Sequence, residues 1–214
     1  MEQPTTFWLL IWFTAGIAIS HAILGPDHYA PFIAISNALS WSRAKTAFIV
    51  FISGLAHVLS SVVIGGIGLL LGLSLKSLEW FEGTRGEVAG WLLILAGIFY
   101  FIWSLRRKYH HHHPEISPAQ VKRTVAFWTL VGLFVLGPCE PLIPLMFVAV
   151  QISWPAVIIS ATVFLILTVI MMEVLVLAGV EGIRLIPVKL SHRLGNVVAS
   201  LFIVALGVAL MLAP

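Results

Sequence analysis

Long apolar runs separated by short polar stretches follow one another along the whole chain. A helix needs about 20 apolar residues to cross roughly 30 Å of hydrocarbon. Six such segments fit the sequence, at residues 7–25, 46–73, 87–105, 123–150, 155–179 and 195–213. The pattern predicts an all-α polytopic membrane protein with six transmembrane helices. The composition agrees, because 60% of the 214 residues are hydrophobic and only 10% are charged.

Positive charges in the expected loops fall mainly on one side of the membrane. One side holds ten Lys and Arg residues: Arg43, Lys45, Arg106, Arg107, Lys108, Lys122, Arg123, Arg184, Lys189 and Arg193. The other side holds Lys76 and Arg85. By the positive-inside rule, the first side is cytoplasmic and both termini lie outside a bacterial-type inner membrane. The apolar start has no basic leader, so we expect it to remain as the first span.

The two halves of the chain match when they are aligned at an offset of 112 residues. "LGPDH" at 24–28 then falls on "LGPCE" at 136–140, and the segment 87–105 falls on 195–213. Three spans in each half predict two inverted repeats, 1–105 and 123–214, joined by a loop at 106–122. A chance recurrence of Leu-Gly-Pro in an apolar chain is the alternative.

A Gly-Pro pair interrupts the first span of each half. Pro26 has no N–H for the carbonyl of Ala22, and Gly25 loosens the chain beside it. Pro138 has the same effect in the second half, so helices 1 and 4 should be broken. Broken helices at membrane depth are tolerated where they lie inside protein or line a wet cavity, and paired breaks indicate a substrate site.

Ionisable side chains gather around these breaks and on the second span. Each costs at least ~2.5–3.5 kcal/mol at the centre of a membrane helix, which favours a functional reason for its presence. Imidazole with carboxylate suits nickel, cobalt, zinc or iron(II), whereas calcium and magnesium prefer oxygen ligands alone. The predicted metal ligands are His21, Asp27, His28, His57, Cys139 and Glu140.

Three of the candidate residues also have simpler interpretations. A lone membrane histidine such as His57 often only bonds a neighbouring helix. Cys139 by itself is a small hydrophobic residue. Glu173 is an accessory candidate, either as a ligand or as a structural or proton-relaying carboxylate. The proximity of His21, Asp27 and His28 in the sequence favours the metal interpretation for His57.

Four consecutive imidazoles lie in the loop between the two halves. They are His110, His111, His112 and His113, on the side expected to be cytoplasmic. Such a tract holds metal loosely and would concentrate ions near the transport site. The alternative is a polar segment without function.

The sequence around the ligands resembles a family of metal transporters. "HAILGPDH" at 21–28 resembles the signature of the nickel/cobalt transporters, and the chain is similar to NicO and UreH-like members of the LysE-like superfamily. "GLAHVLSS" around His57 and "GPCEPLIPLM" around Cys139 and Glu140 resemble further motifs of that family. The resemblance implies a six-helix fold that carries Ni²⁺ or Co²⁺. Five residues separate His21 from Asp27, one more than in the nickel/cobalt pattern.

The expected function is secondary transport of a divalent transition metal ion by alternating access, with Ni²⁺ or Co²⁺ favoured over Zn²⁺ or Fe²⁺. No GxxxxGK[ST] sequence occurs, and we expect no enzyme activity. One alternative is a thiol–disulfide electron carrier, because "GPCEP" also resembles the Pro-Cys element of cytochrome-biogenesis proteins. That chemistry requires a second thiol, and the chain has one cysteine. Another alternative is a non-transporting assembly factor for a metalloenzyme.

The expected partners follow from this function. They are the metal ion and the lipid bilayer, with a homo-oligomer allowed. Nucleic acid is not expected. The net charge of +3 arises from Lys and Arg residues in the loops, and these indicate which side of the membrane each loop faces.

Overall fold

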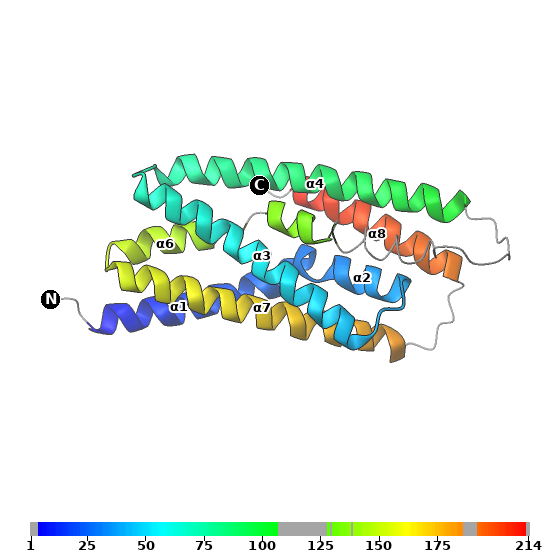
Figure 1. Ribbon diagram of the computed structural model, residues 1–214, viewed down its shortest axis with the longest axis horizontal. Helices are drawn as coiled ribbons and strands as arrows, with labels where there is room; N and C mark the ends of the chain where they lie inside the picture. The colour runs from blue at the N-terminus through cyan, green and yellow to red at the C-terminus, as the bar shows by residue number, and fades with distance from the viewer. Residues whose placement is uncertain (1–3, 107–127, 129, 138, 186–191, 213–214) are drawn as a thin grey trace.

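The computed structural model describes residues 4–106, 128, 130–137, 139–185 and 192–212, and these form helices with no strand among them (Figure 1). The first half contains α1 (Pro4–Leu24), the short 3-10 helix η1 (Pro26–His28), α2 (Ala30–Ala38), α3 (Arg43–Leu70) and α4 (Leu75–Arg106). The second half contains a helical stretch at 130–136, then α6 (Leu142–Val150), α7 (Trp154–Leu185) and α8 (His192–Leu212). The all-α prediction is confirmed for these residues.

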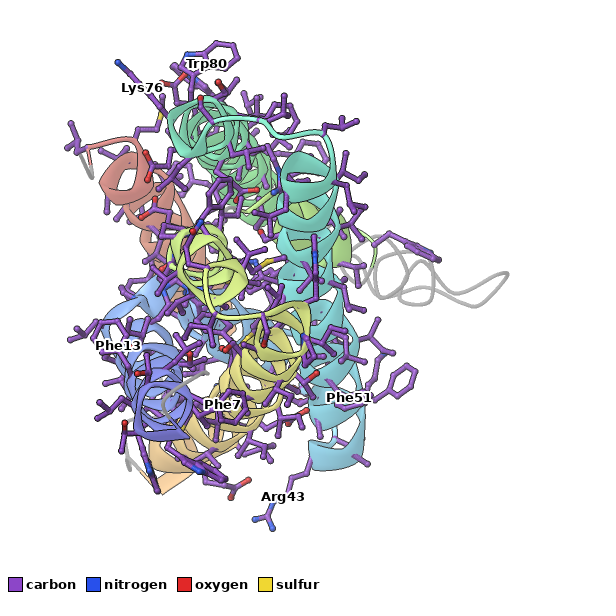
Figure 2. All side chains as sticks on the ribbon, turned by 90° about the vertical axis from the view of Figure 1, so that its left-hand side faces the viewer. Phe7, Phe13, Arg43, Phe51, Lys76 and Trp80 are labelled. Atoms are coloured by element: carbon purple, nitrogen blue, oxygen red, sulfur yellow. The ribbon has the colours of Figure 1, made fainter. Side chains whose placement is uncertain are left out.

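Three of the helices are long and apolar enough to cross a membrane. They span Thr5–Leu24, Arg43–Leu70 and Trp154–Ile183. Their outer faces carry large apolar side chains, among them Phe13 and Phe51, which are 63% and 46% exposed and point away from the bundle (Figure 2). Apolar patches of this extent on a protein surface indicate contact with lipid or with another protein. These helices agree with a location in a membrane.

The first span is interrupted where Gly25 and Pro26 predict a break. α1 ends at Leu24, and the 3-10 helix η1 begins at Pro26 before the chain continues as α2. Gly25 is required there, because a Cβ atom at this position would lie 2.5 Å from His28 Nδ1. In the second half the helix at 130–136 also stops, and α6 begins at Leu142. Both interruptions therefore follow from local proline and glycine chemistry.

Helices of the two halves pair in opposite directions. Arg43 at the start of α3 donates to Glu181 near the end of α7, with 2.7 Å between Nη2 and Oε2. Figure 1 shows α3 and α7 converging toward the end at which Arg43 lies, while α6 lies between them at the opposite end. α2 and α6 have nine residues each, and their first residues, Ala30 and Leu142, are separated by the sequence offset of 112.

α4 and α8 pack closely through small residues. A Cβ atom on Gly97 would lie 2.9 Å from Val204 N and 3.0 Å from Ser200 O. A Cβ atom on Gly207 would lie 2.8 Å from the carbonyl oxygen of Gly90. Small residues that allow two backbones to approach are typical of packed membrane helices, where close van der Waals contact drives association.

Replacing Gly97 by alanine should therefore destabilise the fold. The added methyl group meets backbone atoms, so the two helices must move apart, at a cost of about 1–3 kcal/mol. Thermal unfolding of the detergent-solubilised protein measures the change. Gly83→Ala on the same helix is the control, because nothing lies within 4 Å of its added Cβ. Equal melting temperatures for the two variants would contradict the close packing of α4 against α8.

Arg85 corrects one expectation from the sequence. It was placed in a loop outside the third span, but α4 already begins at Leu75, and Arg85 is buried inside the bundle at 9% exposure. Glu82 lies one helical turn earlier, and the two side chains form an ion pair. The pair satisfies both charges within the fold, so the helix continues through a stretch whose hydropathy alone predicts a loop.

Candidate metal site

Three imidazoles and one thiol meet at the two helix breaks. His21 comes from the end of α1, His28 from η1, His57 from the middle of α3, and Cys139 from the break of the second half. The centroids of the His21 and His28 rings are 4.4 Å apart, and those of His28 and His57 are 4.9 Å apart. His28 and His57 are 3% exposed, and Cys139 is fully buried. Residues from both halves therefore form one cluster.

The ligand atoms of this cluster have spacings that suit a metal ion. His28 Nε2 and His57 Nε2 lie 3.2 Å apart, and Cys139 Sγ lies 3.9 Å from His21 Nε2. One ligand atom each from His21, His57 and Cys139 lies within 4.8 Å of the others. Two nitrogens bound at about 2.0–2.1 Å to a tetrahedral ion are roughly 3.3 Å apart. The His28–His57 separation agrees with that value.

Backbone carbonyl groups lie behind two of the imidazoles. His57 Nδ1 lies 3.2 Å from the carbonyl oxygen of Phe134, and His28 Nδ1 lies 3.2 Å from that of Gly25. A carbonyl oxygen can only accept, so each Nδ1 carries a proton in this arrangement. The two Nε2 atoms, 3.2 Å apart, can then share a cation, which is either a proton held between the rings or a metal ion.

Asp27 lies behind His28. Its Oδ1 is 3.3 Å from His28 Nδ1, the nitrogen that does not face His57. A carboxylate in this position orients a ligating imidazole and raises its basicity. The sequence predicts Asp27 as a ligand, and the structure places it in contact with His28, another predicted ligand.

The remaining predicted ligands occupy different positions. Glu140 follows Cys139 but is exposed, and Glu173 lies half-buried on α7. Among the described residues, the group with metal-ligand spacing consists of His21, His57 and Cys139, and it contains neither of these carboxylates, nor His28 or Asp27. Glu173 Oε2 is buried without a hydrogen-bond partner in the described part of the chain. The tract His110, His111, His112 and His113 lies outside the described residues.

A small cavity adjoins the facing imidazoles. Its volume of about 20 Å³ suffices for roughly one water molecule. It lies between η1, α3, α4 and the end of the helix at 130–136, and its lining residues are Asp27, His28, His57, Ala89, Leu93, Leu133, Phe134 and Gly137. The two imidazoles therefore border a space of about the size that one water molecule requires, and His21 and Cys139 are not among its lining residues.

Sequence reasoning missed two residues that contact this region, Glu82 and Arg85. Cys139 N–H donates to Glu82 Oε2 at 3.1 Å, and Arg85 Nη2 donates to the carbonyl oxygen of Val135 at 2.5 Å. The available signal was an acid and a base three residues apart, a spacing that puts both on one helix face.

The donor set defines the chemistry that the cluster can perform. Imidazole nitrogen and thiolate sulfur bind borderline and soft transition metal ions, and they disfavour calcium and magnesium. A dehydrated ion of that class can be held where apolar helices exclude water.

Comparisons of the chain with protein-family models, with curated proteins and with solved structures found no match.

Proposed function

We propose that the chain is a secondary transporter that carries a divalent transition metal ion across the cell inner membrane. The observation that carries the proposal is the close approach of the Nε2 atoms of His28 and His57, 3.2 Å apart and buried. His21 and Cys139 add two donors beside His57, with which they form a group of metal-ligand spacing. Such a site in a chain with membrane-length apolar helices favours transport of the ion over storage or catalysis.

The cargo belongs to the class of Ni²⁺, Co²⁺, Zn²⁺ and Fe²⁺, with Ni²⁺ or Co²⁺ favoured by the resemblance of "HAILGPDH" to the nickel/cobalt transporters. Imidazole binds all of these ions. The buried Cys139 beside His21 favours the softer ions of the class. In this proposal His21, His28, His57 and Cys139 ligate the ion and Asp27 orients His28.

The mechanism in this proposal is alternating access between two inverted halves of three spans each. Two observations support it: the antiparallel packing of α3 against α7, and the equal length of α2 and α6 at the offset of 112 residues. The breaks of both halves contribute ligands, so a movement of one half against the other would open the site to alternate sides. Both termini would face outward, with the tract at 110–113 on the cytoplasmic side.

Two other functions make different demands on the chain. A thiol–disulfide carrier requires a pair of exchanging thiols, and Cys139 is the one cysteine of the sequence. An assembly factor for a metalloenzyme requires no movement of metal across a membrane by the chain alone.

Metal flux into empty liposomes tests the proposal directly. We expect purified protein in vesicles that contain a metal-sensitive dye to admit Ni²⁺ or Co²⁺ down a gradient. The His28→Ala variant, inserted to the same extent, should admit as little as protein-free vesicles, because it lacks one of the facing nitrogens. Equal signals from the parent and protein-free vesicles would contradict transport and favour the assembly-factor alternative.

A further inference from the structure

Glu82 and Arg85 form a buried ion pair on α4. They are 3% and 9% exposed, and Arg85 Nη1 donates to Glu82 Oε1. Moving two charges out of water costs several kcal/mol per ion unless further hydrogen bonds satisfy them. The partners of this pair therefore indicate what it does.

The partners are backbone groups that the break in the second half leaves free. In a continuous helix, Cys139 N–H would donate to the carbonyl oxygen of Val135, four residues earlier. In the structure Cys139 N–H donates instead to Glu82 Oε2 at 3.1 Å, and Val135 O accepts from Arg85 Nη2 at 2.5 Å. The N–H and the carbonyl group that would bond to each other in a continuous helix are therefore both bonded to this ion pair.

A second carbonyl at the break lies near the same nitrogen. Pro141 has no N–H to offer to Gly137, and Gly137 O lies 3.4 Å from Arg85 Nη2. Nη2 has two N–H groups, and its shorter contacts are with Val135 O and Ser60 Oγ, so Gly137 O can only share one of them. The interrupted chain is therefore tied to α4 mainly through Val135 and Cys139.

The ion pair is joined to the helix that carries His57 as well. Ser61 Oγ donates to Glu82 Oε2 at 3.2 Å, and Arg85 Nη2 donates to Ser60 Oγ at 2.8 Å. Ser60 Oγ in turn donates to the carbonyl oxygen of His57 at 2.7 Å. The segment with Cys139 and the helix with His57 are therefore connected through the same two charged side chains.

We propose that Glu82 and Arg85 are positioning residues that hold the Cys139 thiol at the metal site, in a fixed relation to the imidazoles. The inference rests on the proposed function. It adds to that function the two residues that keep the Cys139 sulfur where it can bind the ion. Without the pair, the backbone at Cys139 has no fixed anchor, and Sγ leaves its position 3.9 Å from His21 Nε2. The hydrogen bond between His28 and the carbonyl oxygen of Gly25 lies within the first half and does not involve this segment.

Cobalt(II) is a suitable probe, because its visible d–d bands report that the ion is bound and its near-ultraviolet charge-transfer band reports thiolate ligation. The full chain in detergent should show both bands with Co²⁺, and Cys139→Ser should lose the charge-transfer band. Glu82→Gln should keep the d–d bands, lose most of the charge-transfer band, and bind Co²⁺ about 10-fold more weakly, the usual effect of removing a group that orients a ligand. Glu87→Gln is the matched control, because Glu87 is an exposed acid on the same helix.

The outcomes separate the two proposals. A parental charge-transfer band in Glu82→Gln overturns the positioning role and leaves the metal site intact. Absence of Co²⁺ binding by the parent overturns the proposed function itself. If Glu82→Gln does not fold, the Arg85→Lys variant is measured in its place. The ammonium group of lysine keeps the charge but cannot donate in the fixed directions of the Arg85 guanidinium group. A charge-transfer band of parental intensity in that variant overturns the inference.

Discussion

Replacing His57 by alanine should abolish transport of Ni²⁺ or Co²⁺ and weaken binding by more than about 100-fold, since groups that merely orient a ligand already contribute 10–100-fold. The change removes one of the two nitrogens that face each other at 3.2 Å. It also removes the donor to the carbonyl oxygen of Phe134. Isothermal titration of the purified protein measures the affinity, and flux into liposomes measures transport.

Ser53→Ala is the matched control for this variant. Ser53 lies one turn before His57 on α3 and is also fully buried, but its hydroxyl has no hydrogen-bond partner among the described residues. We expect it to bind and carry metal as the parent does. Parental affinity in the His57→Ala variant would show that the imidazole only joins two helices.

Replacing Asp27 by asparagine should weaken metal binding by about 10–100-fold without abolishing it. Asparagine keeps an oxygen that can accept from His28 Nδ1 but loses the negative charge beside the ring. The position of Asp27 Oδ1, 3.3 Å from that nitrogen, is the reason to expect a partial effect. Titration calorimetry with Ni²⁺ or Co²⁺ gives the affinity.

The His28→Ala variant provides the comparison for Asp27→Asn. If Asp27 orients His28, the asparagine variant should bind more tightly than His28→Ala does. If Asp27 ligates the ion directly, both variants should lose binding to the same extent. Equal and complete loss would thus restore the ligand role that the sequence suggested.

The helix breaks were predictable because their causes are local. Pro26 lacks an N–H wherever the chain folds, and Gly25 allows the close approach of His28. His21 and His28 lie on either side of that break, so their proximity also follows from the sequence. Local chemistry thus accounts for the first-half part of the candidate site.

The contribution of the second half depends on packing that the sequence does not encode locally. Cys139 and Glu140 are adjacent, and the charge of Glu140 made it the better candidate ligand. The structure points the buried Cys139 towards His21 and leaves Glu140 exposed. Which of two neighbours faces the site depends on the direction in which the broken chain leaves Gly137, and Arg85 on a distant helix contributes to that direction.

Arg85 was misplaced for a related reason. A hydropathy window scores each charge as an independent cost, and α4 carries several charges in its first turns. The cost falls when Glu82 and Arg85 neutralise each other and bond to free backbone groups, but those groups belong to a segment about fifty residues later in the chain. Only the folded arrangement reveals that compensation.

The spacing of Glu82 and Arg85 on one helix also has a consequence for the order in which the fold can form. Residues 135–139 are synthesised after α4, so the charges of α4 cannot at first use those backbone groups. An acid and a base three residues apart already neutralise each other within the helix. When the later segment emerges, it meets a preformed pair of a donor and an acceptor. The order of synthesis therefore allows the ion pair to form before the segment that it holds in the folded protein.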